Sequence, residues 1–192
     1  MSITKFEIYS FWKDKAITND FKIKNYADCK SKDEALPVLE FKDDICCWAC
    51  GMPSLIFGNE DIDKVDNLKK EWNHDRSLQK AHILAKSLGG LETASNLFLL
   101  CPICHAESPD TRESDNFFAW VYYKRKNENY IATMYKELER ACNMKNIDIQ
   151  IVQDYFSEFN YELMILRKHI IKNCTVHGSF CFIIIKNDGT TK

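Results

Sequence analysis

The sequence has few of the residues and segments that mark fibrous, disordered or membrane proteins. Its 192 residues include only six glycines and four prolines, too few for a collagen-like or low-complexity chain. No stretch approaches the roughly 18 apolar residues that a membrane-spanning helix needs. The first seven residues lack the basic start and apolar run of a secretory signal. These absences predict a cytoplasmic protein with no membrane partner.

The chain also lacks an excess of positive charge. Lys and Arg number 26 against 28 Asp and Glu, a net charge of -2, so the whole molecule has no electrostatic attraction to nucleic acid. Any such contact must be local. Apolar residues make up 45% and aromatic residues 12%, which is enough for a packed core. The length favours one main domain with appendages over two full domains.

Nine cysteines, an odd number, exclude complete internal disulfide pairing. Four of them form two Cys-x-x-Cys pairs, Cys47 with Cys50 and Cys101 with Cys104. Two such turns supply the four thiolates of a tetrahedral structural zinc site, which leaves no open position for catalysis. Buried cysteines without metal, or a redox pair, are the alternatives. The pattern therefore predicts Zn²⁺ that holds the fold together, and catalysis must lie elsewhere.

Hydrophobic patterning predicts a hairpin between the two cysteine pairs. Residues 77–84 and 97–100 are suited to strands, a Gly-Gly turn lies between them, and a short helix is expected from residue 105. Farther on, helical spacing of apolar residues predicts a helix over 131–142, with further helices over 147–159 and 161–172. A β-branched run over 180–186 predicts a final strand.

One segment of the chain resembles a known family. Residues 78–90 read Leu-Gln-Lys-Ala-His-Ile-Leu-Ala-Lys-Ser-Leu-Gly-Gly, and residues 95–107 read Ser-Asn-Leu-Phe-Leu-Leu-Cys-Pro-Ile-Cys-His-Ala-Glu. The order of cysteine pair, His-Ile, Gly-Gly, Asn-Leu, apolar strand and a second pair with a trailing His resembles the HNH endonucleases. The resemblance covers about residues 46–125 and implies a treble-clef, ββα-metal core.

The resemblance implies three roles for residues of this sequence. His82 falls at the general base, Asn96 at the asparagine that fixes the loop and the base, and His105 at a ligand of a catalytic Mg²⁺ or Mn²⁺. The chemistry agrees independently, since a histidine with a pKa of about 6.5 is suited to deprotonating water near neutral pH. A hard cation offsets the charge that develops on the phosphate.

One position departs from the family pattern. The family commonly has Asp, His or Glu immediately before the base histidine as a second metal ligand, and this chain has Ala81 there. Three explanations are open. His105 could work with mostly water ligands, another residue could substitute, or activity could be lost. The candidate substitutes are Asp75, His74 and Glu107. We favour the first, because Mg²⁺ tolerates few protein ligands when phosphate oxygens join its shell.

Contacts to DNA are expected from cations near the core. Lys86 follows the base histidine, and Lys124, Arg125 and Lys126 form a basic run that is suited equally to phosphate contact or to a solvated helix end. Duplex DNA is the expected partner, and RNA stays open. Because one core has one active site, cutting both strands would be easiest for a homodimer, which we expect when the target is duplex.

The sequence thus predicts an α+β protein with a small zinc-stabilised core. We expect an N-terminal accessory segment over 1–44, an HNH nuclease core over 45–127, and a helical appendage ending in a strand over 128–192. The predicted function is metal-dependent hydrolysis of DNA phosphodiester bonds. The alternatives are a catalytically silent, zinc-stabilised nucleic-acid-binding module and a protein-interaction scaffold.

Overall fold

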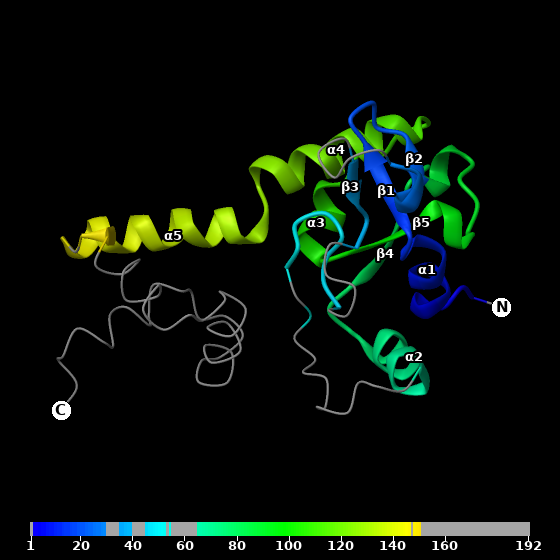
Figure 1. Cartoon of the computed structure of the whole chain (residues 1–192), viewed down its shortest axis with the longest axis horizontal. Helices are drawn as coiled ribbons and strands as arrows, with labels where there is room; N and C mark the ends of the chain where they lie inside the picture. Colours follow the sequence, from blue (N-terminus) through cyan, green and yellow to red (C-terminus); the bar gives the residue numbers. More distant parts are fainter. Residues whose placement is uncertain are drawn as a thin grey trace. The chain divides into compact units, whose positions relative to one another are not determined.

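Thr4 starts the first helix, α1 (Lys5–Trp12), in the computed structural model of the chain (Figure 1). The Thr4 side chain accepts a hydrogen bond from the Glu7 amide, and the Glu7 carboxylate accepts one from the Thr4 amide. This capping box satisfies two of the backbone donors that a helix leaves unpaired at its start. Ile8, Tyr9 and Trp12 on this helix are buried. The aromatic N-terminal run is therefore part of the core.

The structure describes residues 2–29, 35–39, 45–52, 54, 65–146 and 148–150. The chain divides into two compact units, Met1–Asn129 and Tyr130–Lys192. Of the second unit, the structure describes α5 (Tyr130–Lys145) and the few residues after it, and α5 covers the expected helix over 131–142. The helix expected over 161–172 and the strand over 180–186 lie outside the described residues, as does nearly all of the helix expected over 147–159.

The first unit contains a small antiparallel sheet in the order β2-β1-β3. Its strands are β1 (Lys15–Thr18), β2 (Ile23–Asn25) and β3 (Ala35–Pro37). Polar contacts tie this sheet to α4 (Ser114–Asn127). Lys22 forms an ion pair with Asp115, and the Tyr122 hydroxyl donates to Asn19. The segment over 1–44, which the sequence sets apart, thus contacts the helix that follows the second cysteine pair.

The second sheet is the expected hairpin between the cysteine pairs. Helix α2 (Val65–His74) leads into β4 (Gln79–His82), which pairs antiparallel with β5 (Leu97–Leu100). Helix α3 (Pro102–Glu107) follows β5. His82 lies opposite Leu97 and Gln79 opposite Leu100. All four residues of β5 are buried, as expected for an apolar run covered on both faces. Strand β4 is shorter than the strand expected over 77–84.

Phe98 on β5 lies at the centre of an aromatic cluster. Its ring packs edge-on against Trp12 at 5.4 Å and Trp48 at 5.0 Å between ring centroids, and against Phe117 at 5.5 Å. These partners come from α1, from the first cysteine pair and from α4. Edge-to-face packing of this kind adds to the free energy of burying the rings. One core therefore joins the N-terminal helix, the cysteine pair and the hairpin.

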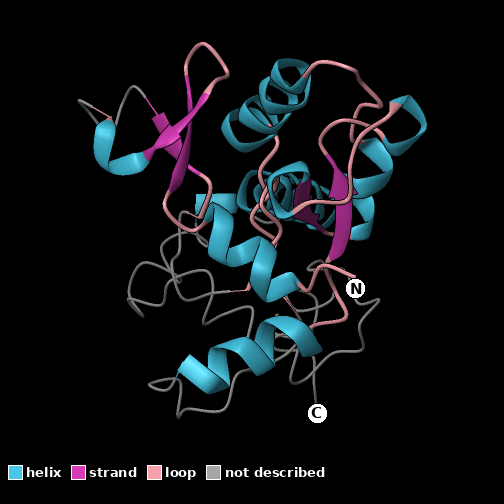
Figure 2. Cartoon of the chain, turned by 90° about the vertical axis from the view of Figure 1, so that its right-hand side faces the viewer, coloured by secondary structure: helices cyan, strands magenta, loops and turns pink. Residues whose placement is uncertain are grey.

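The mixture of helices and small antiparallel sheets makes the described part of the chain an α+β protein (Figure 2). Among the described residues, no helix is both long enough and apolar enough to cross a membrane.

Candidate metal centre and active site

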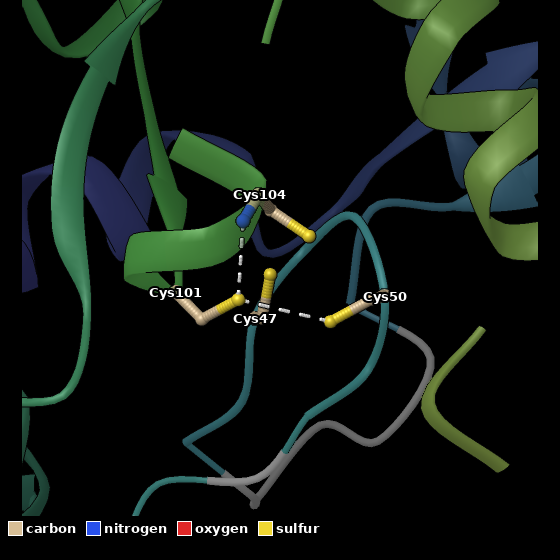
Figure 3. Close-up of side chains that lie close together, drawn as sticks. All are labelled: Cys47, Cys50, Cys101 and Cys104. Atoms are coloured by element: carbon tan, nitrogen blue, oxygen red, sulfur yellow. Dashed lines mark hydrogen bonds between the residues drawn. The ribbon is translucent and has the colours of Figure 1, made fainter. Parts of the chain in front are cut away.

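Four buried cysteines from two segments converge at the end of the hairpin (Figure 3). Cys47 and Cys50 lie in the loop before α2, and Cys101 and Cys104 lie at the start of α3. Their sulfur atoms all lie within 4.8 Å of one another. The Cys50 and Cys101 sulfurs are 3.9 Å apart, far longer than a disulfide bond. Four thiols at this spacing could hold a metal ion such as zinc.

Local hydrogen bonds shape each cysteine pair. In the first pair, the Gly51 amide donates to the Cys47 carbonyl at 2.8 Å, and Gly51 has φ 76°, which favours glycine. In the second pair, Cys101 caps α3 and accepts from the Cys104 amide. The Trp48 amide donates to the Leu99 carbonyl at 3.0 Å, which fixes the first pair against β5. The two turns are thus built independently and joined through the hairpin.

The thiols are electrostatically coupled. Hydrogen bonds from Cys104 and the other two thiols lower the pKa of Cys101. The Cys104 pKa is raised, first by its hydrogen bond to Cys101 and then by Cys47 and Cys50. The contacts that stabilise the Cys101 thiolate therefore make it harder for the Cys104 thiol to ionise. A divalent cation removes this conflict, because metal ligation deprotonates each coordinating thiol. The donor set fits the four-sulfur shell of structural zinc.

Asn96 holds the loop that joins the two strands of the hairpin. Its side-chain oxygen accepts from the Leu84 amide at 2.8 Å, and its side-chain nitrogen donates to the carbonyls of Leu84 at 3.1 Å and Leu91 at 2.9 Å. Asn96 is 9% exposed, so water does not compete well for these groups. These three bonds tie the loop after His82 to the side chain of Asn96.

Gly89 and Gly90 in this loop are each constrained to glycine, but by different features of the structure. Gly89 has φ 93°, in the left-handed region that other residues avoid. Gly90 has an ordinary φ but no room for a side chain, because an added Cβ would lie 1.8 Å from the Leu84 carbonyl oxygen and 2.9 Å from the Asn96 side-chain nitrogen. The Gly-Gly step therefore permits both the turn and its close approach to Leu84.

His82 is the last residue of β4 and is half-buried. The residue that follows it, Ile83, donates its amide to the Asn96 carbonyl at 2.9 Å, so the loop contacts begin directly beside the imidazole. In the described part of the chain, His82 Nε2 is buried and has no hydrogen-bond partner. An unpaired buried polar atom is unusual and costs free energy. His82 is therefore not explained as an ordinary, hydrogen-bonded core histidine.

His105 lies on α3 and is bonded to the first residue of β4. Its Nδ1 lies 2.5 Å from Gln79 Oε1, a partner that the sequence does not suggest. His82 thus lies at the end of β4, and the contact of His105 lies at the start of the same strand. The remaining ring nitrogen of His105 is the one left to bind a cation. Among the described residues, the four cysteines alone form a cluster of three or more potential metal ligands, so His105 has no carboxylate or imidazole cluster around it.

The structure gives a physical reason for Ala81. The residue is fully buried and lies opposite Phe98 in the hairpin register, beside the aromatic cluster. A carboxylate here would lie in an apolar environment, where an ionised group is costly. The Ala81 side chain therefore packs in the core and supplies no metal ligand.

Two of the three possible substitutes for that ligand are already engaged. Asp75 is buried and accepts from Ser54, Ser77 and the Leu78 amide, with Lys5 beside it. Glu107 pairs with Lys124 at 2.6 Å. The third, His74, is an exposed residue at the end of α2. A cation at His105 would therefore keep mostly water ligands, which Mg²⁺ accepts.

The four cations expected to contact DNA fall into two classes. Lys86, in a 3₁₀ turn after β4, and Lys126, at the end of α4, are exposed. Lys124 is half-buried and forms ion pairs with Glu107 and Glu128. Partial burial alone would lower its pKa, but the two carboxylates raise it. Arg125 donates to the backbone carbonyls of Pro37, Val38 and Trp48. Lys124 and Arg125 are thus already engaged by other groups of the protein.

Comparison of the chain with protein-family models, with curated proteins and with solved structures finds no match.

Proposed function

We propose that the chain is a metal-dependent HNH endonuclease that hydrolyses DNA phosphodiester bonds, with structural Zn²⁺ on Cys47, Cys50, Cys101 and Cys104. The observation that carries the proposal is the contact of Asn96 with Leu84, because it locks the loop that starts beside His82. The same hairpin bears His105 on the next helix. His82, Asn96 and His105 thus follow one another in sequence, at the end of β4, directly before β5 and in α3, and the His105 contact lies at the start of β4.

In this proposal His82 takes the proton of the attacking water. Because Nε2 is sealed from solvent, Nδ1 is the ring nitrogen left to reach water in this conformation, and the neutral ring then carries its hydrogen on Nε2. Asn96 keeps the backbone beside the ring in place. His105 would hold the divalent cation, and a bound cation would supply positive charge for the phosphate and the leaving oxygen.

The experiment is a plasmid-nicking assay with Mg²⁺, Mn²⁺ or EDTA. Wild type should cut only with the cation, and His82→Ala should lose at least the 10²-fold that a general base contributes. Lys70→Ala is the control, because Lys70 is an exposed residue of α2 to which no role in the site is assigned. Equal cutting by wild type and His82→Ala would contradict the assignment of the base.

A second candidate function is supported by the burial of Ala81. Since position 81 supplies no ligand, the same fold would suit a catalytically silent, zinc-stabilised module that binds nucleic acid. This candidate predicts that the protein binds duplex DNA, with affinity falling steeply as salt rises, but leaves the plasmid intact with every cation. The nicking assay therefore decides between the two.

A further inference from the structure

The contact between β4 and His105 has no counterpart in the sequence resemblance. Gln79 Oε1 and His105 Nδ1 are 2.5 Å apart. A side-chain amide oxygen can only accept a hydrogen bond, so this pairing puts the hydrogen on Nδ1 and the lone pair on Nε2. Neutral imidazole binds a metal through the nitrogen that lacks the hydrogen. The contact thus sets which ring nitrogen is available as a ligand.

The backbone of His105 is fixed by other bonds. Its amide donates to the Cys101 carbonyl at 2.8 Å, and its carbonyl accepts from the Ser108 hydroxyl at 2.8 Å. These contacts hold the peptide groups of His105 within α3 and leave the ring to turn about its side-chain bonds. Gln79 is the residue that holds the ring.

Strand β4 explains why such a residue is needed here. Gln79 and Ala81 lie two residues apart, so their side chains project from the same face of the strand. Ala81 offers only a methyl group where the resemblance implies a ligand. A site with a single imidazole depends strongly on that ring being oriented in advance, and partners that orient ligating histidines typically change metal affinity by about 10-fold to 100-fold.

We propose that Gln79 is the positioning residue of His105: it fixes Nδ1 as the hydrogen-bond donor and presents Nε2 to a divalent cation. This inference rests on the proposed function, because that function assigns the cation to His105. Gln79 itself touches neither substrate nor metal.

The test uses the full chain labelled with ¹⁵N-histidine at about pH 8, above the ordinary histidine pKa of about 6.5. Long-range ¹H–¹⁵N spectra report which ring nitrogen of His105 carries the hydrogen, and His105→Asn assigns the signals. Titration with Mn²⁺ then reports binding through paramagnetic broadening of the His105 ring. The variants are Gln79→Ala, Gln79→Glu and, as a control, Lys70→Ala on the exposed side of α2.

Wild type should show His105 with its hydrogen on Nδ1 and broadening of that ring by Mn²⁺. Gln79→Ala should show mixed tautomers and an apparent Mn²⁺ dissociation constant raised by about 10-fold to 100-fold. Gln79→Glu keeps the acceptor and should restore the single tautomer, whereas Lys70→Ala should match wild type. Unchanged tautomer and Mn²⁺ affinity in Gln79→Ala would overturn the inference, as would wild type with its hydrogen on Nε2 or without broadening at His105.

These measurements are independent of cleavage. If Mn²⁺ binding at His105 depends on Gln79 but plasmid DNA stays intact, the positioning role holds and the nuclease proposal fails. If plasmid DNA is cut in a His82-dependent manner but Gln79→Ala leaves tautomer and affinity unchanged, the nuclease proposal holds and the positioning role fails.

Discussion

The side-chain amide of Asn96 pairs with both backbone groups of Leu84, twelve positions away in the sequence. It accepts from the Leu84 amide and donates to the Leu84 carbonyl, as a paired strand residue would. A further bond reaches the Leu91 carbonyl. Asn96 therefore extends the hairpin ladder by a side chain and closes the loop at its base. The shape of the chain beside His82 depends on this amide.

Asn96→Ala should destabilise the first unit and loosen the loop. The substitution leaves the Leu84 amide and carbonyl without partners, and unpaired buried groups cost about 1–3 kcal/mol. Urea unfolding gives the change, and hydrogen exchange at the Leu84 amide should speed up. Asn127→Ala is the matched control, because the exposed Asn127 amide donates to a carbonyl of its own helix. Similar losses in both variants would contradict the anchoring role.

The two loop glycines provide a separate test. Gly89→Ala strains the backbone at φ 93°, which costs about 1–2 kcal/mol. Gly90→Ala forces a methyl group into the Leu84 carbonyl and the Asn96 amide, so the loop must move. We expect Gly90→Ala to lose nicking activity and Gly89→Ala to retain part of it, with both variants still folded by circular dichroism. Equal activity would show that the close approach at Gly90 does not matter.

Much of the site could be predicted from the sequence because its determinants are local. The two Cys-x-x-Cys turns, the apolar run over 97–100 and the Gly-Gly step each depend on a few adjacent residues. The clustering of Cys47 with Cys104 follows once zinc geometry is assumed. The α+β class and the hairpin follow from the same short patterns, and the structure confirms both.

The contacts that sequence reasoning missed are long-range side-chain to backbone bonds. In the sequence, Arg125 is part of a basic run. In the structure, its guanidinium donates to the backbone carbonyls of Pro37 and Trp48, more than seventy residues away. Trp12 donates to the Ala94 and Leu97 carbonyls beside the loop. Backbone carbonyls carry no residue-specific signal, so no pattern could predict these partners.

Cys104→Ala should abolish zinc binding and cooperative unfolding. Structural zinc binding is coupled to folding, and three thiolates leave the tetrahedral shell incomplete. Elemental analysis should give one zinc ion per wild-type chain and almost none in the variant, and the thermal transition should broaden or vanish. Cys29→Ala is the control, because Cys29 lies outside the cluster. Full zinc content in Cys104→Ala would contradict the four-sulfur assignment.

Acid should remove a stabilising contribution from Asp75. Burial raises the pKa of this carboxyl, but hydrogen bonds from Ser54, Ser77 and the Leu78 amide outweigh it and hold the pKa below its ordinary value. A lowered folded-state pKa stabilises the fold above the unfolded pKa of about 3.9, and this contribution disappears as pH falls through the folded value. Stability carried by Asp75 is therefore present at neutral pH and lost in strong acid.

The check compares the unfolding free energies of wild type and Asp75→Asn in urea at pH 7 and at a lower pH at which both proteins keep their zinc. At pH 7 the variant should be less stable by about 1–3 kcal/mol, because it weakens bonds to a charged acceptor. The difference in unfolding free energy between wild type and Asp75→Asn should become smaller at the lower pH. Because loss of zinc in acid would remove the cooperative transition, the lower pH is the lowest one at which elemental analysis still finds one zinc ion per chain in both proteins. A gap that widens in acid would mean that the Asp75 pKa is raised.

The exposed and the engaged lysines should differ in their effect on DNA binding. In our proposal Lys86 contacts a phosphate, so Lys86→Ala should weaken DNA binding. It should also make the fall of log affinity with log salt shallower, by about 0.9 in the magnitude of the slope. Lys124 is already paired with Glu107 and Glu128, so Lys124→Ala should leave the slope unchanged. Fluorescence anisotropy with duplex DNA over a salt series gives both slopes. Because each variant removes one positive charge, net charge alone predicts equal changes. If instead the affinity of Lys124→Ala fell less steeply with salt than that of Lys86→Ala, the phosphate contact would lie at Lys124, at the end of α4, and not at Lys86.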